Sequence, residues 1–248
     1  GKLAGIKVAH VESGLRSFNI FHPFPEELTR IFTFQLSDIY FCPGDWAAEN
    51  LKKYRGEKVN TEENTMLDSL KFAKENFDHI KVNMPKEKYC IVSTHRFENI
   101  FKKQQLERIC KQIMKIKNSK VLFILHPPTE IQLKKFGLYE KLSAQENIEL
   151  RPRYDYFQFV KLLYNAEFLI TDGGSNQEES YYMGKPCLLL RKKTERKEGL
   201  GKNVVLSEYK EEAINQFVNN YQDYKIEELK PKESPCEKII ETILKITQ

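Results

Sequence analysis

A glycine-rich turn in residues 170–179 (ITDGGSNQEE) connects an apolar run to a predicted helix. Because glycine lets a ligand approach the backbone and the first turn of a helix offers unpaired N–H groups, the turn Gly173–Ser175 could hold a diphosphate. Glu178 and Glu179 are expected in the first helical turn, where a carboxylate could accept hydrogen bonds from ribose hydroxyls. The alternative is an ordinary helix start, capped by Ser175 and favoured by the acidic residues.

A second group of polar residues, HVESGLR at 10–16, follows another apolar run, and a helix start is predicted at Glu26. Ligand sites of open α/β sheets lie at the carboxyl ends of the strands. Glu12 and Glu26 are therefore candidates for an acid–base pair if the fold brings them together. The alternative is that Glu26, Glu27 and Arg30 are only first-turn charges and an ion pair along one helix.

A third polar segment, STHRFEN at 93–99, follows a further predicted strand. Its His95 imidazolium and Arg96 guanidinium would stabilise the charge of a phosphate. The alternative is a capped turn without a ligand. His126 ends the next predicted strand and could line the same site.

Two further stretches could contact a nucleotide. Residues 191–199, with Arg196 among them, are dense in cations that could bind a diphosphate, although a solvated charge run is the alternative. Four aromatic residues begin a predicted helix and could include one that stacks on a base, although such side chains more often pack in a core; they are Tyr154, Tyr156, Phe157 and Phe159.

Several other classes of protein are disfavoured. The chain has no H-E-x-x-H, D-x-D or Cys/His cluster, so no metal site is predicted, and it lacks a Walker motif and a G-x-S-x-G elbow. Forty Lys and Arg against 35 Asp and Glu give +5 over 248 residues, too little for a nucleic-acid footprint. No run approaches the roughly 18 apolar residues of a membrane span. We expect neither nucleic acid nor membrane as a partner.

The cysteines indicate the compartment. Five are present, widely spaced, mostly in apolar runs and without a C-x-x-C pair, so we predict reduced packing residues; they are Cys42, Cys90, Cys110, Cys187 and Cys236. The chain begins without an export leader, and we expect a cytoplasmic protein. His22 and His79 have no functional context and are predicted to lie at the surface.

Short apolar runs alternate with amphipathic stretches along nearly the whole chain, which predicts an α/β fold with parallel sheets. The predicted strands are Ile6–Val11, Ile39–Cys42, Tyr89–Ser93, Val121–Leu125, Ile148–Leu150, Phe168–Thr171, Pro186–Leu190 and Val204–Val205. Helices are predicted at about 26–36, 45–54, 66–80, 103–117, 130–139, 155–165 and 176–183.

A polar stretch at 77–88 separates two predicted domains. We expect an N-terminal Rossmann-like domain at 1–84, a second at 85–225, and an amphipathic helix at 226–248 that packs back on one of them. The first domain holds only two clear strands, and its first strand reads as a central one. We therefore expect that this domain is N-terminally incomplete.

Seven segments, in order and spacing over nearly the whole chain, closely resemble the non-hydrolysing UDP-N-acetylglucosamine 2-epimerase family. They are His-Val-Glu-Ser-Gly-Leu-Arg at 10–16, Pro-Phe-Pro-Glu-Glu at 23–27, Asn-Thr-Met-Leu-Asp at 64–68, Thr-His-Arg-Phe-Glu-Asn at 94–99, Thr-Asp-Gly-Gly-Ser-Asn-Gln-Glu-Glu at 171–179, Gly-Lys-Pro at 184–186 and Thr-Glu-Arg-Lys-Glu-Gly at 194–199. By this resemblance the chain corresponds to roughly the C-terminal two-thirds of such an enzyme.

The resemblance implies two Rossmann-like domains of the glycosyltransferase B type, with UDP held mainly by the second. It implies inversion at C2 of UDP-N-acetylglucosamine through a 2-acetamidoglucal intermediate, with no cofactor. Glu12 and Glu26 match the acid–base residues, and His95 matches the residue at the phosphate and leaving group. The positions that match substrate-binding residues are Arg30 in the sugar pocket, Phe159 for stacking on uracil, Gly173 and Gly174 at the phosphate turn and Glu179 for the ribose. We further expect Ser175, at the start of the predicted helix, and Arg196 to contact the phosphate.

We therefore expect a cytoplasmic, homodimeric sugar-nucleotide epimerase that feeds N-acetylmannosamine units into surface polysaccharide. One alternative is a hydrolysing 2-epimerase, which releases UDP and free N-acetylmannosamine. The other is an inactive, truncated remnant that only binds the sugar nucleotide.

Overall fold

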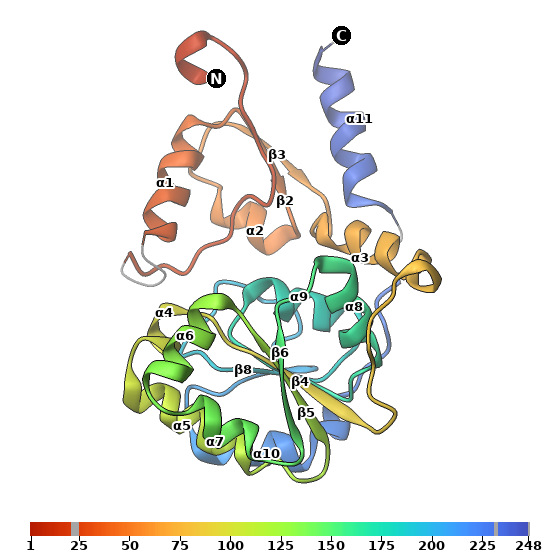
Figure 1. Ribbon diagram of the computed structural model, residues 1–248. Coiled ribbons are helices and arrows are strands. Elements are labelled where there is room, and N and C mark those ends of the chain that lie inside the picture. Colours follow the sequence, from red (N-terminus) through yellow and green to blue (C-terminus); the bar gives the residue numbers. More distant parts are fainter. Residues whose placement is uncertain (21–24, 231–232, 248) are drawn as a thin grey trace. The chain divides into compact units, whose positions relative to one another are not determined.

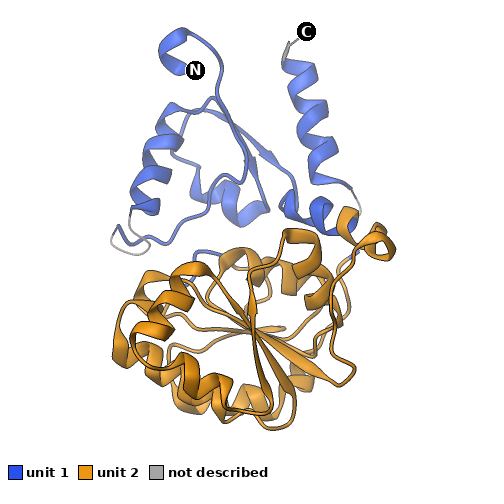
Figure 2. Ribbon diagram, in the orientation of Figure 1, with its two compact units in different colours: residues 1–71, 194–196, 230–248 blue, residues 72–193, 197–229 orange. Residues whose placement is uncertain are grey.

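The computed structural model describes residues 1–20, 25–230 and 233–247, and the chain forms two compact units (Figures 1 and 2). Unit 1 consists of Gly1–Lys71, Thr194–Arg196 and Lys230–Gln248, and unit 2 consists of Phe72–Lys193 and Lys197–Leu229. The chain thus begins and ends in unit 1. The predicted domain limits at 84/85 and 225/226 stay predictions, and the predictions on His22, Pro23 and Phe24 lie outside the described residues.

Unit 1 is built around a three-stranded parallel sheet in the order β1-β2-β3. The strands are β1 (Ala9–His10), β2 (Ile39–Cys42) and β3 (Glu57–Asn60). The helices are η1 (Lys2–Ala4), α1 (Glu26–Leu36), α2 (Asp45–Asn50) and α11 (Pro235–Thr247), and α3 (Met66–Glu75) continues into unit 2.

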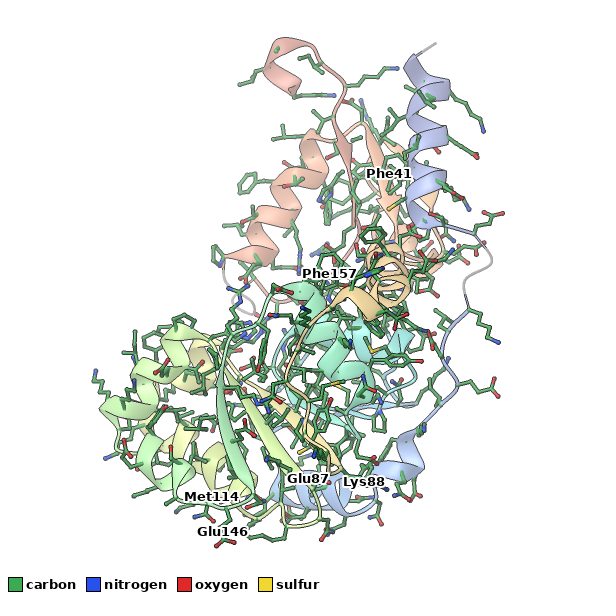
Figure 3. All side chains as sticks on the ribbon, turned by 45° about the vertical axis from the view of Figure 1, so that its right-hand side comes forward. Phe41, Glu87, Lys88, Met114, Glu146 and Phe157 are labelled. Atoms are coloured by element: carbon green, nitrogen blue, oxygen red, sulfur yellow. The ribbon has the colours of Figure 1, made fainter. Side chains whose placement is uncertain are left out.

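The central strand β2 is buried on both faces because all four of its residues are apolar. Tyr40 and Cys42 pack against side chains of α1 and α2 on one face. On the other face Phe41 packs against Ile239 of α11 (Figure 3). The predicted apolar face of α11 is only partly buried, since Ile240 remains 57% exposed.

Two predictions for unit 1 differ from the structure. The strand predicted over Ile6–Val11 is reduced to Ala9–His10, with Ile6 62% exposed, and within the described residues β1 pairs with β2 alone. The strand β3 (Glu57–Asn60) is not predicted, because its sequence EKVN has one apolar residue and lacks the alternation that marks a half-buried strand.

Unit 2 contains a six-stranded parallel sheet in the order β6-β5-β4-β7-β8-β9. The strands are β4 (Tyr89–Ser93), β5 (Lys120–Leu125), β6 (Ile148–Pro152), β7 (Leu169–Thr171), β8 (Cys187–Leu189) and β9 (Val204–Leu206). Counted along unit 2, this is the order 3-2-1-4-5-6 of a doubly wound Rossmann sheet. The predicted α/β fold with two parallel sheets is confirmed.

Helices cover both faces of this sheet (Figure 1). They are η2 (Phe77–His79), α4 (Phe97–Ile100), α5 (Lys103–Met114), α6 (Pro127–Lys135), α7 (Tyr139–Ser143), α8 (Tyr156–Asn165), α9 (Gly174–Tyr182), α10 (Glu211–Asn219) and η3 (Tyr221–Tyr224). A core of apolar side chains lies between the sheet and α5, α6, α7 and α10, and Met114 packs at its border (Figure 3). On the opposite face the Tyr89 hydroxyl donates to the Leu162 carbonyl of α8 at 2.7 Å.

The cysteines agree with the prediction of reduced packing residues. All five are free thiols, and four are buried, with Cys236 half-buried. His79 is exposed, as predicted. Among the described residues, no helix combines the length and apolar character that crossing a membrane requires.

Candidate active site

The polar residues of unit 2 gather where its strand order reverses. β4 and β7 are neighbours in the sheet, and Ser93 pairs with Thr171 at their carboxyl ends. His95 follows one strand and Asp172 the other, so both lie at the topological switch point, the place where open α/β sheets bind ligands.

The carboxylate of Asp172 organises this edge of the sheet. It is fully buried and accepts hydrogen bonds from the backbone N–H of His95 at 3.1 Å, the backbone N–H of Arg96 at 3.0 Å and Nδ2 of Asn99 at 2.8 Å. Nδ1 of His95 lies 3.3 Å from Oδ1 of Asp172. The Asn99 amide also donates to the Leu190 carbonyl beyond β8 at 3.0 Å, so three strand ends are tied together.

The His95 side chain is 39% exposed and stacks on His126, with ring centroids 4.4 Å apart and an interplanar angle of 24°. Burial, followed by the positive charges of His95 and Arg153, lowers the pKa of His126 to about 4. His126 is therefore neutral at pH 7 and offers His95 an uncharged ring face.

The glycine turn starts α9 two residues earlier than predicted. Gly173 is the N-cap and Gly174 is the first helical residue, so Ser175 is not the cap. The expectation that Glu178 and Glu179 lie in the first turn is wrong, because the earlier start moves them into the second turn. The N–H groups of Gly174 and Ser175 belong to the first turn, where the helix itself supplies no acceptor and an anion can bind.

Gly173 packs closely against the Asn176 and His95 side chains. A Cβ there would lie 2.8 Å from Oδ1 of Asn176 and 3.5 Å from Cε1 of His95. The Gly173 N–H donates to Oγ1 of Thr171 at 3.0 Å, and this hydroxyl in turn donates to Asn176 at 3.0 Å. The start of α9 is therefore a tightly bonded turn next to the His95 ring.

Two further predicted nucleotide-binding residues lie in unit 2. Glu179 is 3% exposed, and Nδ2 of Asn176 donates to its Oε2 at 2.9 Å. Phe159 is half-buried on α8, whose N-cap Asp155 accepts a hydrogen bond from the Gln158 N–H at 2.8 Å. Both elements begin at the carboxyl edge of the sheet, since α8 follows β6 and α9 follows β7.

In unit 1 the predicted acid–base residue Glu12 lies two residues after the end of β1, in a strained conformation. Its φ is 58°, in the left-handed region, where non-glycine residues are uncommon and cluster at functional sites. The Arg196 guanidinium donates to its carboxylate. The next residue fixes the turn, because the Ser13 N–H donates to the Phe41 carbonyl at 2.8 Å and the Ser13 hydroxyl lies 2.9 Å from Nδ1 of His10.

The two glutamates that begin α1 have opposite surroundings. Glu26 is exposed, whereas Glu27 is fully buried and accepts hydrogen bonds from Nε of Arg16 at 2.5 Å and from the backbone N–H of Ser17 at 3.0 Å and of Phe18 at 3.2 Å. Burial opposes the charge of Glu27, but the hydrogen bonds from Ser17 and Arg16 outweigh it and hold the pKa of Glu27 below its usual value.

The charge run after β8 contributes to this cluster. Glu195 and Arg196 are 7% and 8% exposed, which rules out the solvated alternative for these two residues. Arg30 lies 3.6 Å from Glu195, beside the pair that Arg196 forms with Glu12. The structure thus brings together three predicted residues, Glu12, Arg30 and Arg196, as two adjacent ion pairs.

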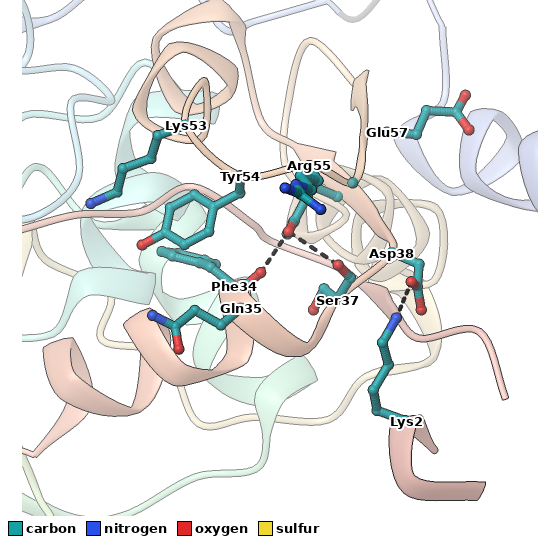
Figure 4. A pocket seen from close by; sticks show the side chains of 11 residues that line it. Lys2, Phe34, Gln35, Ser37, Asp38, Lys53, Tyr54, Arg55 and Glu57 are labelled. Atoms are coloured by element: carbon teal, nitrogen blue, oxygen red, sulfur yellow. Dashed lines mark hydrogen bonds and ion pairs between the residues drawn. The ribbon is translucent and has the colours of Figure 1, made fainter. Parts of the chain in front are cut away.

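A cavity of about 550 Å³ lies elsewhere in unit 1 (Figure 4). Its lining includes Asp38 and Gly56, which precede β2 and β3, so it opens at the amino ends of the strands, whereas Glu12 follows the carboxyl end of β1. This cavity is therefore separate from the predicted site. Within the described part of the chain, no three His, Cys, Asp or Glu side chains are grouped to hold a metal ion.

Asp172 and Asn176 have no role in the expectations from sequence, and Glu27 was expected only as a first-turn charge or an ion-pair partner of Arg30, from whose Nη1 its Oε2 lies 4.0 Å. Asp172 directly follows a buried strand, and this position could have identified it as a candidate site residue. Asn176 precedes Glu179 by three residues, a spacing at which helical side chains meet. Glu27 has no such signal, because only the packing of α1 distinguishes it from Glu26.

A family model described as UDP-N-acetylglucosamine 2-epimerase matches residues 1–243. The UDP-N-acetylglucosamine 2-epimerase of Methanocaldococcus jannaschii is 34% identical over 226 residues, covering 84% of this chain and 60% of that protein. A UDP-N-acetylglucosamine 2-epimerase homolog of Methanococcus maripaludis is 36% identical over 230 residues, covering 86% of this chain and 63% of that protein. The chain thus spans less than two-thirds of these relatives' length.

A solved structure is also similar. The UDP-N-acetylglucosamine 2-epimerase of Neisseria meningitidis, bound to UDP-N-acetylglucosamine, matches with a TM-score of 0.83 at 26% identity, over 98% of this chain and 71% of that one.

Proposed function

The chain belongs to the UDP-N-acetylglucosamine 2-epimerase family, and from this premise we propose that it interconverts UDP-N-acetylglucosamine and UDP-N-acetylmannosamine. The proposal rests on the arrangement of donor groups at the carboxyl edge of the unit 2 sheet. There the first turn of α9 at Gly174 adjoins the His95 imidazole, which gives a diphosphate both N–H donors and a group that can carry positive charge.

We assign UDP binding to unit 2. The N–H groups of Gly174 and Ser175 would hold the phosphates, and the buried carboxylate of Glu179 would accept hydrogen bonds from the ribose. Asn176 supports this role, because its amide fixes the Glu179 carboxylate at 2.9 Å. Phe159, half-buried on α8, would stack on the uracil.

The proposed reaction consists of two proton transfers at C2 and the breaking and re-forming of the C1–O bond. A base removes the proton from C2 while the C1–O bond breaks, so that UDP leaves with the bonding electrons and a 2-acetamidoglucal remains. An acid then returns a proton to C2 on the opposite face, and a phosphate oxygen of UDP adds to C1. No hydride is transferred, so this sequence of steps uses no nicotinamide.

We assign the proton transfers to Glu12 and Glu26. The strained backbone of Glu12 and its pairing with Arg196 support this role, because strain at a polar residue is kept where function requires it. Glu26 is exposed at the first residue of α1 and so is accessible to a ligand. Arg30 would bind the sugar.

We favour the non-hydrolysing outcome, in which the product stays linked to UDP. Within unit 2, His95 and the start of α9 would hold UDP after the C1–O bond breaks, so that it can add back. In the hydrolysing alternative water attacks the glucal, and free N-acetylmannosamine accumulates with UDP. We further propose a cytoplasmic homodimer that supplies N-acetylmannosamine units for surface polysaccharide.

Calorimetric titration of the chain with UDP tests the binding site. We expect saturable binding that Glu179→Ala weakens about tenfold or more, the loss expected when charge-assisted hydrogen bonds are removed. The matched control is Glu146→Ala, an exposed carboxylate in the same unit that precedes β6 (Figure 3). Equal affinities for wild type and Glu179→Ala would remove Glu179 from the site.

A further inference from the structure

The carboxylate of Asp172 has surroundings that its packing does not explain. It is fully buried, and its hydrogen bonds come from neutral donors, namely two backbone N–H groups and the Asn99 amide. Burying a charge among neutral donors costs free energy that a neutral side chain would avoid. Two side chains near Asp172 carry or can gain a positive charge. The Arg96 guanidinium donates through Nε to the Asp172 backbone carbonyl at 3.0 Å, whereas the His95 imidazole faces the carboxylate itself, with Nδ1 3.3 Å from Oδ1.

The surroundings of His95 select one orientation of its ring. Nδ1 faces Asp172, Cε1 lies toward Gly173, and one ring face is stacked on His126 at 4.4 Å. Because the two nitrogens of an imidazole lie on different sides of the ring, Nε2 is directed away from the carboxylate. The side chain is 39% exposed, so a ligand can approach it.

We propose that Asp172 is a positioning residue, which holds the proton of neutral His95 on Nδ1 and leaves Nε2 as the nitrogen that meets the departing phosphate. This inference rests on the proposed function, in which His95 contacts the leaving group.

The carboxylate has a second effect in the reaction. Negative charge develops on the phosphate oxygen as the C1–O bond breaks. With one proton held on Nδ1, Nε2 donates a hydrogen bond to that oxygen only after the exposed ring has taken up a second proton from solvent and become an imidazolium. Asp172 stabilises the imidazolium by accepting a hydrogen bond from its Nδ1–H group.

The same carboxylate also sets the distance between His95 and the start of α9. It binds the backbone N–H groups of His95 and Arg96, while its own residue immediately precedes the N-cap Gly173. Asp172 therefore ties the loop that carries the imidazole to the turn that carries the helical N–H donors, and we expect the network to affect the chemical step more than ground-state binding.

The test compares wild type with Asp172→Asn. We expect kcat to fall about 10²-fold or more with little change in KM, the pattern for a group that acts in the transition state. Nitrogen-15 NMR of the His95 ring, assigned with His95→Gln, should show the Nδ1-protonated tautomer in the neutral wild type. In Asp172→Asn the two ring-nitrogen shifts should move toward each other as the tautomers mix.

Asn203→Ala is the control for lost stability. Asn203 is a fully buried amide of unit 2 that donates to the carbonyls of Ser180 and Lys185, at 2.9 and 2.8 Å. We expect it to lower the melting temperature while keeping kcat. The proposal is overturned if the wild-type tautomer is unchanged in Asp172→Asn, or if Asn203→Ala loses kcat equally at a matched loss of stability. The NMR result decides the role of Asp172 even if wild type shows no epimerase turnover, which would refute the proposed function instead.

Discussion

Replacing Glu27 by Gln should destabilise unit 1 far more than the same change at its neighbour Glu26. Glu27 is fully buried and accepts three hydrogen bonds that fix residues 16–18 to the start of α1. Glu26 is exposed at the first residue of the same helix. The pair is a matched comparison, because the two substitutions are chemically identical and adjacent.

The magnitude follows from the hydrogen bonds and the ion pair that the substitution removes. A hydrogen bond to a charged group contributes about 1.5–3 kcal/mol, and removing one partner of a buried ion pair costs about 3–5 kcal/mol. The amide oxygen of the new side chain would still accept one of the three hydrogen bonds, while its NH2 group would face donors and the Arg16 guanidinium would lose its counter-charge. We therefore expect Glu27→Gln to lower the free energy of unfolding by about 2–4 kcal/mol.

Urea denaturation followed by circular dichroism measures this difference. Glu26→Gln should change the free energy of unfolding by less than about 0.5 kcal/mol, as surface substitutions usually do. If Glu27→Gln also costs less than this, the buried carboxylate does not hold the segment in place, and the reasoning for residues 16–18 is wrong.

Two further predictions concern close packing at a glycine and the burial of a histidine. Gly14→Ala should cost about 3 kcal/mol or more by urea denaturation, because its φ is 89° and a Cβ would lie 2.1 Å from the Ala47 carbonyl oxygen; Gly137→Ala, with φ 67° and open space, should cost only about 1–2 kcal/mol. The pKa of His126 is lowered from 6.5 to about 4. The unfolded chain therefore takes up its proton first, and stability should fall by at most about 3 kcal/mol between pH 6.5 and 4. The free energy of unfolding of His126→Phe should depend less on pH over this range. An unchanged pH dependence would refute the assignment of the lowered pKa to His126.

Strands that are buried on both faces were predictable from the sequence. Ile39–Cys42 and Tyr89–Ser93 have the predicted bounds, because an unbroken apolar run between polar turns fits a central parallel strand. The strand Glu57–Asn60 was not predictable, because its polar side chains carry no periodic signal. Its pairing with β2 comes from the backbone and depends on contacts distant in sequence.

The candidate site was predictable as a set of loops but not as a set of contacts. The rule that ligands bind at the carboxyl ends of parallel strands led to Glu12, His95 and Gly173. The network of Asp172 depends on β4 and β7 being neighbours, and they are separated by two other strands in the sequence. The start of α9 was predicted too late because glycine has low helix propensity, whereas here Gly173 is the N-cap and Gly174 is the first helical residue.

Proton NMR of UDP-N-acetylglucosamine incubated with the 248-residue chain in D2O tests the proposed reaction most directly. We predict deuterium at C2 and formation of UDP-N-acetylmannosamine, with exchange reduced about 10²-fold or more in Glu12→Gln while UDP affinity is retained. A substrate that keeps its C2 proton while UDP binds would contradict epimerase activity and favour a binding remnant. Stoichiometric free N-acetylmannosamine without UDP-N-acetylmannosamine would contradict the non-hydrolysing outcome.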